Sequence, residues 1–295
     1  MKILLIYFTG TFNTWFLTDK IEEKFIERKD TVERLEIKID SKPIDTFNYD
    51  LIGFGYPIYA LNSPQPFNKY IKKLKFKHNQ KYFIYKDSGE TFKINNSSSR
   101  IIKRCFKHYK MTFLGEYHYI MPYNIRFPFD KSFIQELLEY DEKLLDIMFY
   151  NLDNNIIHNI KGNIISQISS RALSIQKPGA KLNSYFYSID NDKCIKCLKC
   201  IENCPNHNII LKNDKIVFKH NCNMCMRCSF FCPTNAIKIG ILNNWKVNHY
   251  YDLNNINPKE TNYINKNSKG FYKCFIKTFE EIDETYKEIN NKKER

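Results

Sequence analysis

Residues 194–205 read CIKCLKCIENCP, and residues 222–233 read CNMCMRCSFFCP. In both stretches three cysteines follow one another at steps of three residues, and a fourth cysteine stands directly before a proline. The two stretches contain eight of the ten cysteines in this chain of 295 residues. Because cysteine thiolates are good ligands for soft metals, such clustering indicates metal binding.

The spacing predicts two [4Fe-4S] clusters with crossed ligation. Three thiolates at steps of three residues can reach three corners of a cubane cluster, whereas the fourth, followed by proline, is carried to the other cluster. The predicted ligands of one cluster are Cys194, Cys197, Cys200 and Cys232, and those of the other are Cys222, Cys225, Cys228 and Cys204. The alternative is zinc, which takes two Cys-x-x-Cys pairs at longer separation and explains neither the third cysteine nor the prolines.

The residues around these cysteines repeat as well. Apolar side chains between the ligands would keep water away from the sulfur atoms. Strand-like segments at 209–211, 216–218 and 236–239 would complete a scaffold that is repeated twice. In these features residues 186–240 resemble the bacterial two-cluster ferredoxins, which implies an electron-transfer domain.

The first 160 residues alternate short apolar runs with amphipathic stretches. The strand-like runs are residues 2–8, 31–38, 50–56, 81–86 and 112–121. The helix candidates are residues 14–27, 66–74, 97–110 and 130–152. Strands that alternate with helices pair in parallel through right-handed crossovers. The sequence therefore predicts an α/β sandwich of three layers around a five-stranded parallel sheet.

A candidate phosphate loop, Thr-Gly-Thr-Phe-Asn-Thr at residues 9–14, lies between the first strand and the first helix. Such a loop offers unpaired backbone N–H groups and the positive end of a helix dipole to an anion. The chain has no Gly-x-x-x-x-Gly-Lys pattern here, which excludes an ATP-type loop. A turn that only caps the helix is the alternative, but doubly wound sheets bind their ligands at this edge.

Taken together, the two halves resemble the flavodoxin–ferredoxin fusions ("ferrodoxins") of anaerobic bacteria. The flavodoxin half of that family has a Ser/Thr-Gly-Thr-Gly-Asn-Thr phosphate loop, and the residues that match it are Thr9, Gly10, Thr11, Asn13 and Thr14. Phe12 stands where the family has glycine, which implies a φ below zero or a strained backbone. The resemblance implies that this half binds FMN.

Two further loops match the family by position, after the third and fourth strands. The resemblance implies that Pro57 and Tyr59 in the first loop, and Ser88 and Gly89 in the second, contact the flavin. Tyr59 would stack on the flavin ring, with packing inside the protein as the alternative.

The expected domains are an FMN-binding domain at 1–160, a linker at 161–185, a ferredoxin-type domain at 186–240 and a tail at 241–295. Lys177-Pro178-Gly179 predicts a turn in the linker. The resemblance continues more loosely to Trp245, Tyr250 and Tyr251. The tail ends in an amphipathic helix that we expect to pack on the protein itself, with an apolar face made of Phe275, Phe279, Ile282, Tyr286 and Ile289. Cys105 and Cys274 are expected to be free thiols in helices.

Composition and charge limit the cellular location and the binding partners that we expect. The longest apolar run, residues 3–8, is too short for a membrane span or a secretory signal, so we expect a cytoplasmic protein with reduced thiols. The formal net charge is +14, and two clusters and a flavin phosphate would lower it to about +8. The lysines are spread along the chain, which favours a solvated surface over a surface that binds nucleic acid or membrane.

These features predict an electron carrier that relays electrons between FMN and two [4Fe-4S] clusters, with other redox proteins as donors and acceptors. Such a chain would bridge two-electron and one-electron carriers in low-potential anaerobic metabolism. No residue is predicted to be catalytic. Two alternatives stay open: a flavin- and iron–sulfur-dependent oxidoreductase acting on a small organic substrate, and a redox-sensing protein that binds nucleic acid.

Overall fold

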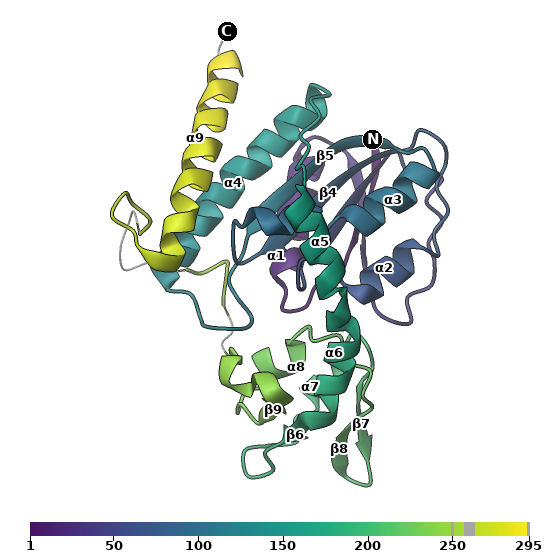
Figure 1. Ribbon diagram of the computed structural model, residues 1–295. Helices are drawn as coiled ribbons and strands as arrows, with labels where there is room; N and C mark the ends of the chain where they lie inside the picture. The colour runs from purple at the N-terminus through teal and green to yellow at the C-terminus, as the bar shows by residue number, and fades with distance from the viewer. Residues whose placement is uncertain (249–250, 257–262, 294–295) are drawn as a thin grey trace.

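The computed structural model describes residues 1–248, 251–256 and 263–293 of the chain (Figure 1). The aromatic position predicted at residue 250 lies outside these ranges. Among the described residues, no helix has the length and apolar character needed to cross a membrane.

A five-stranded parallel sheet forms the centre of the N-terminal half. Its strands are β1 (Lys2–Tyr7), β2 (Thr31–Glu36), β3 (Leu51–Pro57), β4 (Lys81–Ser88) and β5 (Thr112–Ile120). They pair in parallel in the order β2-β1-β3-β4-β5. This order defines the flavodoxin-like doubly wound fold, so the predicted fold class and the five predicted strands are confirmed.

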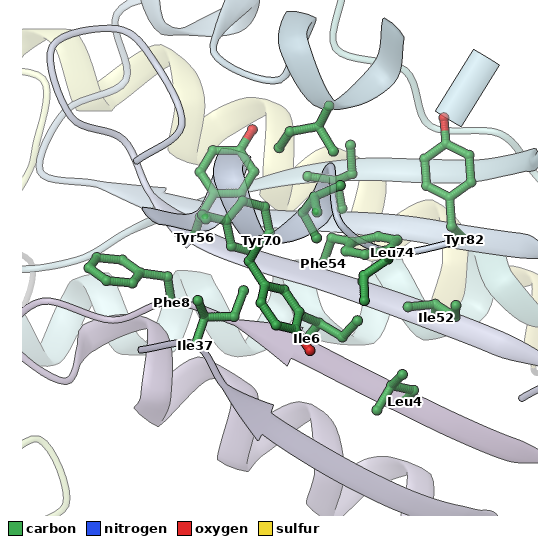
Figure 2. Close-up of a cluster of buried hydrophobic side chains, with 14 of the residues drawn as sticks. Leu4, Ile6, Phe8, Ile37, Ile52, Phe54, Tyr56, Tyr70, Leu74 and Tyr82 are labelled. Carbon is green, nitrogen blue, oxygen red and sulfur yellow. The ribbon is translucent and has the colours of Figure 1, made fainter. Parts of the chain in front are cut away.

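Helices cover both faces of this sheet. One face carries α1 (Asn13–Glu27) and α4 (Lys131–Asp153), and the other carries α2 (Gln65–Ile71), the 3-10 turn η1 (Lys93–Ser97) and α3 (Arg100–His108). Successive strand residues alternate between the two cores, since side chains of a strand point to opposite faces. Figure 2 shows Leu4, Ile6, Ile52 and Phe54 in the core on one face of the sheet, and residues of α2 and α3 belong to the same core.

The C-terminal helix α9 (Lys273–Lys293) runs alongside α4 (Figure 1). The rings of Tyr140 and Phe279 stack with centroids 3.7 Å apart, and Lys143 Nζ lies 2.6 Å from Asp283 Oδ1. Phe275, Phe279 and Ile289 are buried, whereas Ile282 and Tyr286 are half-buried. The prediction that this helix packs on the protein is confirmed.

The predicted turn in the linker is wrong, because this segment is helical. It consists of α5 (Ile164–Ala172), η2 (Leu173–Ile175), α6 (Gln176–Asn183) and η3 (Ser184–Phe186). Pro178 is the third residue of α6, and in the first turn of a helix the missing N–H of proline breaks no hydrogen bond.

A small module follows at the end of the sheet (Figure 1). Its antiparallel pairs are β6 (Tyr187–Ile189) with β9 (Ile237–Ile239), and β7 (Ile209–Lys212) with β8 (Lys215–Phe218). Two short helices, α7 (Lys199–Glu202) and α8 (Arg227–Phe230), occupy equivalent positions in the two repeats. The strands predicted in this module are confirmed; η4 (Gly240–Trp245) and η5 (Gly270–Tyr272) lie between it and α9.

Candidate metal centres and the phosphate loop

Two cysteine-lined cavities lie in this module. Cys194, Cys197, Cys200, Cys228 and Cys232 line the first cavity. Cys204, Cys222, Cys225 and Cys228 line the second cavity. The four cysteines of each predicted group thus lie around one cavity, Cys228 lines both, and the assignment of each cysteine to one cluster stays a prediction.

The backbone between the cysteines has the same unusual conformation in both repeats. Lys196 and Met224 have φ values of 52° and 55°, and Leu198 and Met226 have φ values of 59° and 62°. Left-handed backbone costs a residue with a β-carbon roughly 1–2 kcal/mol. Such strain persists where the surroundings impose it, which is typical of ligand-binding loops. In this module the left-handed residues bend each loop, and the cysteines of the loop line its cavity.

Backbone N–H groups point at several of the sulfur atoms. Asn208 donates to Cys204 Sγ at 3.3 Å, and Ala236 donates to Cys232 Sγ at 3.2 Å, four residues after the cysteine in each repeat. Such bonds stabilise a thiolate and tune the potential of a cluster bound to it. No three Cys, His, Asp or Glu side chains in the described part of the chain are grouped so as to hold one metal ion. The fit to clusters therefore rests on the two cavities and their donors.

Burial sets the protonation of the thiols before any metal is bound. Burial raises the pKa of the Cys200 thiol to about 11 and that of Cys225 to about 12. Burial also acts on Cys232, but hydrogen bonds from backbone N–H groups outweigh it and lower the pKa of that thiol. Buried thiols such as Cys225 are therefore neutral at neutral pH, and binding of iron must displace their protons.

The candidate phosphate loop lies where it was predicted, between β1 and α1, and keeps part of an anion site. The backbone N–H groups of residues 9–15 find no acceptor among the described residues. Thr9 Oγ1 is buried and has no hydrogen-bond partner in the described part of the chain. Phe12 has a φ of 72°, so of the two expected conformations the strained one is found. The loop thus has the donors that a phosphate would need.

The other polar side chains of this loop are already engaged by the protein. Thr14 Oγ1 donates to Asp87 Oδ1 at 2.5 Å, and Asn13 Nδ2 donates to the Pro122 carbonyl at 2.8 Å. Thr11 Oγ1 accepts from Asn124 Nδ2 at 3.1 Å. Burial raises the pKa of Asp87 to about 7.

The space for a flavin ring is filled by two tyrosines. A β-carbon on Gly10 would lie 2.1 Å from the Tyr59 hydroxyl, and one on Gly89 would lie 2.2 Å from the ring of Tyr123. Tyr59 packs edge-on against Phe8, with ring centroids 6.3 Å apart, which is the packing alternative for this residue.

Pro57 and Ser88, the other predicted flavin contacts, also belong to the protein interior. Pro57 is buried at the end of β3, and Ser88 Oγ lies 2.8 Å from His118 Nε2. Tyrosine side chains thus lie directly over Gly10 and Gly89, and as packed these residues do not fit a flavin ring.

The cysteine-rich module is a ferredoxin domain, which supports an electron-transfer role. The model of the 4Fe-4S binding domain matches residues 187–210. A ferredoxin of Methanothermococcus thermolithotrophicus is 38% identical over 56 residues, which are 18% of this chain and 93% of that protein. An uncharacterized ferredoxin of Methanocaldococcus jannaschii is 34% identical over 56 residues, 18% of this chain and 90% of that protein. The chain belongs, through this domain, to the ferredoxin family.

Solved structures resemble the N-terminal half. Oxidised Flavodoxin 1 from Bacillus cereus covers 52% of this chain and 98% of its own, with 15% identity and a TM-score of 0.40. The flavodoxin of Streptococcus pneumonia TIGR4 covers 52% of this chain and 99% of its own, with 13% identity and a TM-score of 0.38.

Proposed function

We propose that this chain is an electron carrier that holds two [4Fe-4S] clusters and exchanges single electrons with other redox proteins. The proposed ligands of the first cluster are Cys194, Cys197, Cys200 and Cys232, and those of the second are Cys204, Cys222, Cys225 and Cys228. The observation that carries the proposal is the pair of cavities lined by these two groups. The match to ferredoxins supports it.

Each cluster, when bound, supplies a one-electron couple, and the protein tunes and shields it. Apolar side chains such as Ile237 and Phe218 border the cavities and lower the dielectric around the sulfur atoms. N–H groups of Asn208 and Ala236 stabilise the added negative charge.

FMN has no part in this proposal. The loop amides suit a phosphate, but Tyr59 and Tyr123 fill the space of the ring. The predicted bridging of two-electron and one-electron carriers depends on a flavin and is not part of the proposal. Reduction of a small organic substrate by a flavin is left out for the same reason. Binding of a nucleic acid is left out because no contact described in this site favours it.

Replacement of one crossed ligand tests the proposal. Cys204→Ser should damage the cluster that also uses Cys222, Cys225 and Cys228, while the first cluster keeps its EPR signal in the reduced, oxygen-free protein. Cys105→Ser, in α3 and outside both cavities, is the control. The wild-type protein should contain about eight iron and eight sulfide per chain. A colourless protein loaded with zinc, or damage confined to the first cluster, would overturn the proposal.

A further inference from the structure

The two cysteine repeats share their spacing but not their surroundings. Cys197 is exposed, whereas its counterpart Cys225 is only 7% exposed. Lys199 is exposed, whereas its counterpart Arg227 is 3% exposed. Because the local fold repeats, the difference must come from what covers the second repeat.

The phosphate loop covers the second repeat, and Arg227 ties the two together. Arg227 Nη2 donates to the Thr9 carbonyl and Arg227 Nε to the Gly10 carbonyl, both at 2.7 Å. Nη2 also lies 3.0 Å from Glu36 Oε1, at the end of β2. Nη1 donates to the Asn203 carbonyl at 3.3 Å. The guanidinium is thus paired with a carboxylate and three carbonyls, as a buried cation requires.

Close packing completes this contact. The rings of Phe12 and Phe231 lie 5.1 Å apart, and the Arg227 guanidinium lies 5.0 Å from the centre of the Phe12 ring. A β-carbon on Gly10 would lie 2.8 Å from the Cys225 carbonyl oxygen. Only glycine permits this approach of the two backbones.

We infer that residues 222–231, which carry three ligands of the second cluster, occupy the place at the sheet edge where this fold otherwise binds a flavin, so that the chain carries clusters and no FMN. Flavodoxin-like sheets bind FMN at the switch point between β1 and β3. In this chain Gly10 follows β1 and Tyr59 follows β3, and Cys225 lies against both. The assignment of a cluster to these cysteines rests on the proposed function; the exclusion of flavin rests on the packing.

Charge supports the inference that a cluster takes the place of the flavin phosphate at the amino end of α1. A [4Fe-4S] cluster with four thiolates carries about two negative charges, similar to a phosphate monoester. The amino end of α1, with its unpaired N–H groups, favours negative charge within its first turn. A β-carbon on Gly10 would lie 3.5 Å from Cys225 Cβ, so this proposed ligand of the second cluster lies close to the positive end of α1. A phosphate in the same place would be repelled by the cluster.

Flavin content tests the exclusion. We expect the cluster-loaded protein, purified without oxygen, to release no flavin on acid precipitation. Added FMN should keep the fluorescence of free FMN in the presence of the loaded protein. One FMN per chain, or quenching of added FMN at equal concentration, would overturn the inference while leaving the two clusters in place. Absence of iron from the chain would instead overturn the proposed function.

Amide hydrogen exchange tests the docked contact. Arg227→Gln removes the bonds to the Thr9 and Gly10 carbonyls, so exchange of the hydrogen-bonded amides at the two ends of the loop, those of Phe8 and Phe16, should become about tenfold faster, the change that loss of a typical net hydrogen bond gives. Lys199→Gln changes the equivalent position of the first repeat and should leave exchange of these two amides unchanged.

A second variant covers the case in which Arg227→Gln loses iron. Glu36→Gln removes only the charged partner of Arg227 and should give faster exchange of the Phe8 and Phe16 amides with full iron content. Unchanged exchange of these two amides in the iron-loaded variants would refute the docking.

Discussion

Phe12 is a phenylalanine in a backbone conformation that suits glycine. Its φ of 72° is strained, and its ring contacts Phe231 and Trp15, with centroids 5.1 and 6.3 Å away. The sequence predicted the loop and the misfit of Phe12, but not the partner of its ring. That partner lies in the second cysteine repeat, far along the chain, where no local pattern could indicate it.

Two substitutions of Phe12 separate the cost of its strained backbone from the contribution of its packed ring. Phe12→Ala and Phe12→Gly both lose the ring, but only alanine keeps a β-carbon at positive φ. We expect Phe12→Gly to be more stable than Phe12→Ala by about 1 kcal/mol in chemical unfolding of the loaded protein. Equal stability would mean that the loop leaves the left-handed conformation once the ring is gone.

Asp87 should make stability depend on pH. Burial raises its pKa to about 7 in the folded protein, against the hydrogen bond from Thr14. The folded state therefore binds a proton that the unfolded state has released, and the free energy of unfolding falls as pH rises to about 7. The loss should be about 2 kcal/mol between pH 5.5 and 8.

Removal of the carboxyl group checks this dependence. Asp87→Asn should flatten the pH profile of the unfolding midpoint between about pH 5.5 and 8. Asp146→Asn, whose carboxylate pairs with Lys24 at 2.7 Å near the surface, is the control and should leave the profile as in wild type. An unchanged profile in Asp87→Asn would contradict the assignment to Asp87.

At the scale of elements, apolar periodicity predicted the five strands and the helices α1 to α4, because these elements bury apolar faces. It failed at α5, whose buried side chains are polar. Ser166 Oγ lies 2.7 Å from Ser97 Oγ, and Ser170 Oγ donates to Asn62 Oδ1 at 2.8 Å. A helix that buries serines and exposes Ile164 and other isoleucines has no apolar face toward the core to detect.

The packing of helix α9 on α4 should depend on one aromatic contact. Phe279 is buried and stacks on Tyr140 of α4. Phe279→Ala should lower the free energy that holds α9 on α4 by about 3–5 kcal/mol, since truncation of a buried phenylalanine leaves a cavity. Faster amide exchange across residues 273–293, with unchanged cluster EPR signals, would be the expected result.

A surface residue of the same helix serves as the control for Phe279→Ala. Lys277 is exposed and pairs with Glu281 one turn away, at 3.6 Å. Lys277→Ala should change exchange in α9 little, because exposed pairs of this kind contribute about 0.3–0.5 kcal/mol. Loss of the clusters in Phe279→Ala would show instead that α9 supports the whole molecule.

At the scale of the whole molecule, the sequence predicted both halves and the two groups of cysteines, because spacing and periodicity are local. It did not predict how the halves meet. Arg227 and Gly10 are 217 residues apart, and the only sequence signal is an arginine in the second repeat where the first has Lys199. Nor did the sequence indicate the packing of Tyr59 and Cys225 against Gly10, on which the inferred exclusion of FMN rests.

This arrangement makes the two proposed clusters unequal in access to solvent. Cys197 and Ile195 are exposed beside the first cavity, whereas Cys225 is buried against the sheet. Oxidants and chelators attack clusters that they can reach, so limited treatment with ferricyanide should remove the first cluster before the second. EPR of the re-reduced protein should then show a single uncoupled cluster, with a spectrum different from that of Cys204→Ser, which keeps only the first.

The contact between Arg227 and the phosphate loop should determine which cluster is lost first. In Arg227→Gln the second repeat loses its cover, so the two clusters should be lost at more similar rates, whereas Lys199→Gln should keep the wild-type order. Simultaneous loss in the wild-type protein would contradict the unequal exposure. Because electrons tunnel to a partner from the accessible centre, we expect redox partners to dock at the proposed first cluster. Partner oxidation should therefore slow when a bulky side chain covers Cys197, as in Ile195→Trp, and should be unaffected by substitution of exposed Lys212 on β7.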